Sequence, residues 1–170
     1  MLTAYENTIV CYSFSKSLSL PGERIGYLAL NPALAAHDAV AAALLEAAES
    51  LGFRAAPSLM QHALTDCVGL TADLELYRQN RDLLYDMLTD LGLSCIRPEG
   101  AFYLFVKAPI DDAVAFSEAA KAWELLLVPS DDFGVKGYLR LAYCVPADTI
   151  RRAEPAFRAL AAAYGLKKEG

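Results

Sequence analysis

Residues 13–24 read Ser13-Phe14-Ser15-Lys16-Ser17-Leu18-Ser19-Leu20-Pro21-Gly22-Glu23-Arg24. Short apolar and β-branched runs flank this stretch, at Thr8–Ser13 and Arg24–Leu30, and both are predicted to be buried strands. Pro21 and Gly22 are typical of a turn between the two runs. The sequence therefore predicts a loop that joins two strands and carries serine hydroxyls, one amine and one guanidinium.

Such a loop has the groups needed to bind an anion both covalently and electrostatically. Lysine adds to a carbonyl compound only as the free amine, so a site that uses one has to lower the lysine pKa from about 10.4 by burial or by a nearby positive charge. Arg24 is a candidate for that charge, and a guanidinium also pairs bidentately with phosphate. Serine hydroxyls can satisfy further phosphate oxygens. Taken alone, however, a lysine among serines is more often a solvated loop residue.

From residue 33 onward, helices come first and strands then alternate with helices. Asn31-Pro32 is typical of a helix start and Gly52 of a helix end, which predicts a helix at Ala33–Leu51. Further helices are predicted at 57–69, 72–91, 112–124 and 147–164. Strands are predicted at 94–96, 101–107, 125–128 and 138–144. This order predicts an α/β or α+β protein.

Three details refine the predicted architecture. The helix at 72–91 has one amphipathic stripe, which is expected to pack in the core and contains Leu74, Tyr77, Arg81, Leu84, Leu88 and Leu91. Pro155 is predicted to kink or split the last helix, because proline cannot donate the helical hydrogen bond. The first two strands make a poor sheet alone, so they are expected to be the end of a larger sheet.

The composition argues against several classes of function. A formal net charge of −6, with acidic and basic residues mixed along the chain, argues against a nucleic-acid partner. The sequence has no uncharged run long enough to cross a bilayer and no signal-peptide start, so a cytoplasmic protein without a membrane partner is expected. Neither the scattered cysteines nor the two histidines suggest a metal site, and the thiols are expected to be reduced: Cys11, Cys67, Cys95 and Cys144.

Three segments, taken in order, resemble the fold-type I aminotransferases of class I/II, which depend on pyridoxal 5'-phosphate (PLP). The loop at 13–27 is similar to the family's Ser-x-Ser-Lys followed by Pro-Gly-x-Arg-x-Gly-Tyr. Residues 97–103 are similar to its Pro-x-Gly-Ala-Phe-Tyr segment, and 137–141, preceded by Phe133-Gly134, to its terminal arginine strand. Three motifs with the expected structural context make coincidence improbable.

This resemblance implies a role for each matching residue. Lys16 is implied as the covalent anchor of the cofactor and as the group that moves the substrate proton. Ser13, Ser15 and Arg24 match the contacts to the cofactor phosphate, and Arg140 matches the arginine that holds the substrate α-carboxylate. Amino acids and 2-oxo acids are the implied substrates, and a homodimer is the implied assembly.

The resemblance also implies a domain division. Residues 1–32 correspond to a remnant of the large cofactor-binding domain with two strands of its sheet, 33–56 to an interdomain helix and linker, and 57–170 to the C-terminal small domain. In the family, the acidic partner of the cofactor ring nitrogen and the stacking aromatic residue both precede the lysine. This chain is therefore expected to be a truncated portion that is inactive by itself.

Several alternatives to an aspartate aminotransferase-like parent remain open. Carbon-sulfur lyases of the same fold type share the lysine and both arginines. A second alternative is the aminotransferase-like ligand-sensing domain of a transcription regulator, which would need a basic DNA-binding segment upstream. A third is that the chain acts only as a folding or assembly unit.

Overall fold

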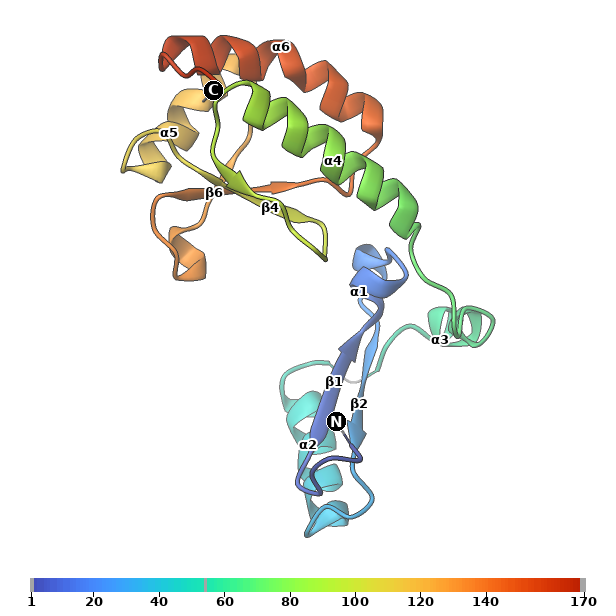
Figure 1. The fold of residues 1–170 in the computed structure, drawn as a ribbon. Helices are drawn as coiled ribbons and strands as arrows, with labels where there is room; N and C mark the ends of the chain where they lie inside the picture. Colours follow the sequence, from blue (N-terminus) through green and yellow to red (C-terminus); the bar gives the residue numbers. More distant parts are fainter. Residues whose placement is uncertain (1, 54, 169–170) are drawn as a thin grey trace. The chain divides into compact units, whose positions relative to one another are not determined.

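The computed structural model describes residues 2–53 and 55–168 (Figure 1). Contacts divide the chain into two units, Met1–Ala72 and Asp73–Gly170. In the described part of the chain, no helix is both long and apolar enough to span a membrane. Each unit is described below by itself.

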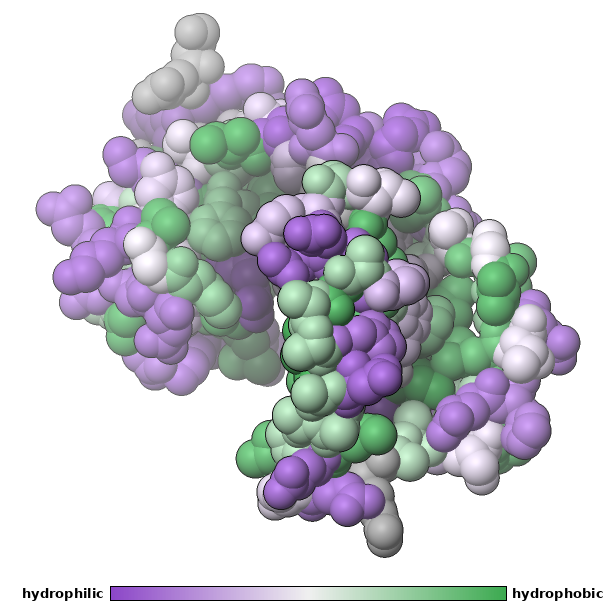
Figure 2. Space-filling model, turned by 90° about the horizontal axis from the view of Figure 1, so that it is seen from below, coloured by the Kyte–Doolittle hydropathy of each residue, from purple (hydrophilic) through white to green (hydrophobic). Residues whose placement is uncertain are grey.

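The first unit is built on an antiparallel pair of strands, β1 (Ile9–Ser13) and β2 (Gly26–Leu30). Both predicted strands are therefore confirmed, but the prediction that they are buried is wrong, because most of their residues are exposed. Within the described residues this sheet has only two strands, so both of its edges are open. Hydrophobic side chains accordingly remain on the surface of this unit, among them Tyr12, Leu28 and Leu45. Figure 2 shows hydrophobic residues, drawn in green, on the surface of the molecule.

The helices of the first unit are shorter than predicted. A short helix, α1 (Phe14–Ser17), and the 3-10 helix η1 (Pro21–Glu23) lie between the strands, and α2 (His37–Ser50) and α3 (Ser58–Thr65) follow them. The predicted start of α2 at residue 33 is wrong. The side chain of Asn31 accepts a hydrogen bond from the backbone of Ala33 at 2.9 Å, and it thereby caps a turn before the helix.

The second unit contains a four-stranded antiparallel sheet with the order β3-β4-β6-β5. The strands are β3 (Cys95–Ile96), β4 (Tyr103–Lys107), β5 (Val128–Pro129) and β6 (Tyr138–Ala142). The helices are α4 (Leu74–Asp90), α5 (Ala113–Ala120), α6 (Ala147–Ala163) and the 3-10 helices η2 (Lys121–Trp123) and η3 (Asp131–Phe133). Figure 1 shows α4 and α6 side by side over one face of the sheet.

The two faces of this sheet differ in burial. Leu104 and Val106 of β4 alternate with Tyr103 and Phe105, and only the first two are fully buried in the core. The core is completed by side chains from β6 and from all three α-helices, among them Leu139, Leu141, Leu88, Phe116, Phe157 and Leu160. Because Arg140 lies between two buried leucines on β6, it belongs to the half-buried face opposite the helices.

The last helix and the boundary between the two units differ from what the sequence predicts. The helix α6 runs continuously through Pro155, so the predicted split is wrong. Pro155 is exposed, which lets water reach the backbone carbonyl that lacks its helical donor. The contact boundary lies after Ala72, and the backbone N–H of Ala72 donates to the carbonyl of Ser17 at 2.7 Å. The assignment of 57–72 to a small domain stays a prediction of the sequence.

Candidate functional site

The lysine loop, residues 13–26, is the closed end of the β1–β2 hairpin. Ser13 and Gly26 form the last residue pair of the ladder, and the backbone N–H of Phe14 donates to the carbonyl of Ile25 at 3.1 Å. A Cβ atom at position 26 would collide with the carbonyl oxygen of Tyr12, so glycine is required for this close approach. The hairpin thus brings the two ends of the loop together.

Two of the predicted site residues are directly joined. Ser13 caps α1, and its hydroxyl oxygen accepts a hydrogen bond from the backbone N–H of Ser15 at 3.2 Å. The hydroxyl of Ser13 also donates to that of Ser15 at 3.0 Å. Lys16 is the next residue of the same helical turn, and it is exposed. The same short helix therefore carries an exposed lysine and one of two joined serine hydroxyls.

Arg24 stands at the other end of the lysine loop, in an unusual backbone conformation. Its φ of 50° and ψ of 50° place it in the left-handed region, which is uncommon for a residue with a side chain. The guanidinium donates through Nη1 to the carbonyl of Pro21 at 2.8 Å. Its other N–H groups have no hydrogen-bond partner in the described part of the chain, and they are the groups with which Arg24 can bind an anion.

An aromatic cluster lies at the base of the loop. The ring centroids of Tyr12 and Phe14 are 5.2 Å apart, and those of Tyr12 and Tyr27 are also 5.2 Å apart. Phe14 and Tyr27 are separated by 5.9 Å. Such pairs contribute on the order of 1 kcal/mol each beyond their buried area, so they stabilise the strand ends that carry the loop.

Arg140 belongs to the second unit, where its guanidinium lies over two aromatic rings. The guanidinium carbon lies 4.5 Å from the ring centroid of Tyr103 on β4 and 4.4 Å from that of Phe133 at the end of η3. These distances are within the range of cation–π contacts. No carboxylate of residues 2–53 and 55–168 forms an ion pair with Arg140. The N–H groups of its guanidinium are therefore not occupied by an internal carboxylate.

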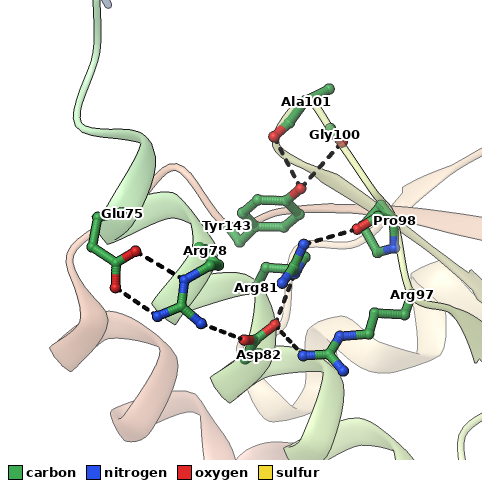
Figure 3. Close-up of polar contacts among 9 residues, drawn as sticks. All are labelled: Glu75, Arg78, Arg81, Asp82, Arg97, Pro98, Gly100, Ala101 and Tyr143. Carbon is green, nitrogen blue, oxygen red and sulfur yellow. Dashed lines mark hydrogen bonds and ion pairs between the residues drawn. The ribbon is translucent and has the colours of Figure 1, made fainter.

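A polar network holds the turn that precedes β4 (Figure 3). We call it the 98–101 network, and its side chains are those of Arg81 and Asp82 on α4, Arg97 and Tyr143. Arg81 donates through Nη1 to the carbonyl of Pro98 at 3.2 Å. The hydroxyl of Tyr143 donates to the carbonyl of Ala101 at 3.0 Å. Asp82 joins this network by accepting from Nε of Arg81 at 2.8 Å and by pairing with Arg97 at 2.7 Å. Hydrogen bonds from Arg81 and Arg97 lower the pKa of Asp82 to about 2.

The sequence predicts Lys16, Ser13, Ser15, Arg24 and Arg140 as site residues, but it does not indicate the two rings beside Arg140. In the sequence, Tyr103 is only part of a motif, and Phe133 is only the residue before a glycine. Strand alternation carries a usable signal, because it places Tyr103 on the face of the sheet that does not pack against the helices. No sequence signal indicates that Phe133 returns to that face. Among the described residues, no cluster of potential metal ligands is present.

Comparisons with known proteins give a consistent result. A family model described as aminotransferase class I and II matches residues 1–156. A probable N-acetyl-LL-diaminopimelate aminotransferase of Bacillus subtilis is 31% identical over 152 residues, which cover 86% of this chain and 38% of that protein. The aspartate/prephenate aminotransferase of Thermus thermophilus is 30% identical over 154 residues, with coverages of 88% and 40%. The chain thus spans about 40% of the length of these relatives.

Solved structures agree with the sequence relatives. A crystal structure of an amino transferase from Eubacterium rectale has 47% sequence identity and a TM-score of 0.84, and the match covers 95% of this chain and 41% of that one. A mutant of Thermus thermophilus aspartate aminotransferase in complex with tryptophan has 27% identity and a TM-score of 0.78, with coverages of 93% and 42%. Both likenesses extend over nearly the whole of this chain.

Proposed function

Because this chain belongs to the class I and II aminotransferase family, we propose that the whole protein transfers an amino group from an amino acid to a 2-oxo acid. The resemblance seen in the motifs is confirmed, as are the predicted α/β fold class and its place in the fold-type I architecture. PLP is the cofactor of this family. Because the chain spans about 40% of its relatives, the reaction is proposed for the full protein.

The lysine loop has the donor set that PLP requires. Bound PLP supplies an electron sink for the bond that is broken at the substrate α-carbon. In this proposal the amine of Lys16 anchors the cofactor covalently and later removes the proton from that carbon. The paired hydroxyls of Ser13 and Ser15 and the unpartnered N–H groups of Arg24 hold the phosphate.

Arg140 is proposed to bind the substrate α-carboxylate. Its guanidinium has no internal carboxylate partner in the described residues, and a guanidinium fork matches the geometry of a carboxylate. Binding there would fix the carboxylate end of the substrate, and holding a substrate in one orientation contributes much of the rate enhancement of enzymes.

The observation that carries the proposal is the closed hairpin loop, in which Lys16 follows the joined Ser13 and Ser15. The test is an assay of the full-length protein with aspartate as donor and 2-oxoglutarate as acceptor. Lys16→Ala should reduce kcat by at least about a thousandfold, because the group that moves the proton is lost. Lys107→Ala is the matched control, since Lys107 is an exposed lysine on β4. Equal activity of Lys16→Ala and the wild type would contradict the proposal.

We propose further that the preferred donor is aspartate or a similar amino acid. Relatives with this specificity support it, although relatives named for diaminopimelate and for aromatic amino acids are also similar to this chain. A panel of these donors, compared by kcat/KM, decides among them. Release of pyruvate and ammonia from a sulfur-containing amino acid without any acceptor would instead indicate a carbon-sulfur lyase.

A homodimer is part of the same proposal. The open edges and exposed hydrophobic residues of the β1–β2 sheet are surfaces that a longer chain or a second copy can cover. Sedimentation equilibrium of the full-length protein tests this directly, and a monomer at micromolar concentration would contradict it.

A further inference from the structure

The guanidinium of Arg140 lies over two aromatic rings. Tyr103 comes from strand β4 and Phe133 from the 3-10 helix η3, so two separate elements provide the rings. An arginine side chain in solution has many rotamers, and fixing it on binding a ligand costs conformational entropy. A guanidinium that already lies against two rings has lost part of that freedom before the ligand arrives.

We propose that Tyr103 and Phe133 are positioning residues, which fix the plane of the Arg140 guanidinium so that a ligand meets only its N–H edge. This inference rests on the proposed function insofar as the ligand is a substrate carboxylate. The guanidinium carbon lies 4.5 Å and 4.4 Å from the two ring centroids, and the N–H bonds of a guanidinium lie in its own plane. A planar group with two acceptor oxygens fits that edge.

Tyr103 is held in place by strand pairing and by the turn before it. In the register of β4 and β6, Tyr103 is opposite Ala142, and it is therefore the diagonal neighbour of Arg140. The 98–101 network fixes the turn from which β4 begins. Phe105 is directly opposite Arg140 on the same face, yet its ring makes no cation–π contact with it.

Phe133 is held by a second device, the buried hydroxyl of Ser130. Ser130 is fully buried, and its hydroxyl lies 2.5 Å from the carbonyl of Val135 and 2.8 Å from that of Tyr138. The backbone N–H of Phe133 donates to the carbonyl of Ser130 at 2.9 Å. These contacts close the loop between β5 and β6 and bring Phe133 over Arg140. Because Phe133 is itself 48% exposed, a substitution there leaves the core intact.

This geometry predicts selection of a carboxylate over a primary amide. A carboxylate offers two oxygens to the guanidinium edge, whereas an amide offers one oxygen and turns its own N–H donors toward those of Arg140. An arginine that can tilt or rotate would find other ways to meet the amide. The rings should therefore increase the ratio of carboxylate affinity to amide affinity, and this ratio is the quantity to measure.

The experiment uses the PLP-loaded full-length protein and isothermal titration calorimetry. The probes are 2-methylaspartate and the same compound with its α-carboxylate replaced by a primary amide; neither has the α-hydrogen that the reaction removes. Tyr103→Leu and Phe133→Leu should each lower the carboxylate-to-amide ratio by roughly three- to tenfold. Tyr103→Phe, which keeps the ring, and Phe105→Leu, which removes a ring that makes no cation–π contact with Arg140, should keep the wild-type ratio. Arg140→Leu should abolish most of the preference for the carboxylate over the amide.

The outcomes separate this inference from the proposed function. If the wild type fails to transfer amino groups but the ratio still falls in the two leucine variants, the inference holds and the proposed reaction is wrong. If Arg140→Leu lowers the ratio while Tyr103→Leu and Phe133→Leu leave it unchanged, the inference is overturned. It is also overturned if Phe105→Leu lowers the ratio as much as Phe133→Leu. A thermal unfolding scan of each variant shows whether a lower ratio comes from misfolding. If Tyr103→Leu does not fold, the result with Phe133→Leu decides, because that substitution leaves the core intact.

Discussion

The hydroxyl oxygen of Tyr143 lies 3.0 Å from the carbonyl oxygen of Ala101, a residue whose φ of 61° is in the left-handed region. A residue with a Cβ atom is strained by roughly 1–2 kcal/mol in that region. Tyr143 is only 2% exposed, so its ring is fixed and its hydroxyl reaches the turn from the core. The hydrogen bond offsets part of the strain in the turn that leads into β4.

The first prediction follows from this contact. Tyr143→Phe removes the hydroxyl but keeps the ring, and it should lower the free energy of unfolding of the second unit by about 1 kcal/mol. Tyr138→Phe on β6 is the control, because the hydroxyl of Tyr138 has no hydrogen-bond partner among the described residues. Urea denaturation measures both. Equal stability of the two variants would show that water replaces the Tyr143 hydroxyl at no cost.

The core gives the second prediction. Leu88 on α4 is completely buried, whereas Leu74 on the same helix is 65% exposed. Leu88→Ala should lower the free energy of unfolding by about 2–5 kcal/mol, because it removes buried methyl groups and leaves a cavity. Leu74→Ala should change it by less than about 0.5 kcal/mol. A comparable loss in both variants would mean that something outside the described contacts covers Leu74.

This pair of leucines also shows how far periodicity can predict burial. The stripe at 72–91 was expected to pack in the core, and Leu84, Leu88 and Leu91 do so, but Leu74 does not. Periodicity places residues on one face of a helix, but it does not say how far the partner surface extends. Asp73 caps this helix by accepting from the backbone N–H of Leu76, at 2.9 Å. The predicted bounds, 72–91, nevertheless come within two residues of those of α4, Leu74–Asp90.

Non-local contacts were beyond the reach of the sequence. Asn80 is 1% exposed, and its side-chain amide donates to the carbonyls of Tyr143 and Val145, which lie more than sixty residues further along the chain. Nothing in the neighbourhood of Asn80 distinguishes it from a solvated helix residue. The motifs identified the residues of the candidate site because those depend on short spacings. The rings around Arg140 depend on register and loop closure, which short spacings do not determine.

The third prediction concerns pH. The pKa of Asp82 is lowered to about 2 by hydrogen bonds from Arg81 and Arg97, so the unfolded chain takes up a proton at higher pH than the folded one. The stability from this carboxylate is complete above about pH 4 and is lost as the pH falls towards 2. Asp82→Asn should therefore be less stable than the wild type at pH 6, and the difference should shrink by pH 2.5.

Glu75 supplies the control for that experiment. Hydrogen bonds from Arg78 and Gln79 lower its pKa to about 2 as well, but the pair of Glu75 and Arg78 is open to solvent. Because exposed ion pairs contribute little, Glu75→Gln should change the pH dependence less than Asp82→Asn does. Urea denaturation at pH 6, 4 and 2.5 measures how far the free energy of unfolding of Asp82→Asn, and that of Glu75→Gln, differs from the wild-type value. A constant gap between Asp82→Asn and the wild type at all three values would contradict the prediction.

Thiol reactivity provides the fourth prediction. Burial raises the pKa of Cys95 to about 11, whereas Cys144 in the same unit is exposed. Because the thiolate is the reactive form, Cys95 should react at pH 8 at least a hundredfold more slowly than Cys144 with a thiol reagent. Peptide mapping after timed labelling gives the two rates. Similar rates for the two cysteines would mean that β3 opens readily. Labelling in urea is the control, because both cysteines should then react fast.

The last prediction concerns the lysine loop in this chain of 170 residues. The loop is closed by Ser13 and Gly26 within the first unit, so it should bind PLP weakly even without the rest of a longer protein. The proposed covalent bond to Lys16 and the proposed phosphate contacts both involve residues of this unit. Borohydride reduction after addition of PLP traps the adduct, and peptide mapping locates it.

Lys16 should carry most of the trapped label, and Lys16→Ala should remove it. Arg24→Ala should reduce labelling at Lys16 by roughly three- to tenfold, because it removes a charge-assisted contact to the phosphate that solvent partly screens. Pyridoxal without the phosphate is the control ligand, and its labelling should not depend on Arg24. Even labelling of the other lysines would mean that Lys16 is an ordinary surface amine in this chain; the ones to compare are Lys107, Lys121, Lys136, Lys167 and Lys168.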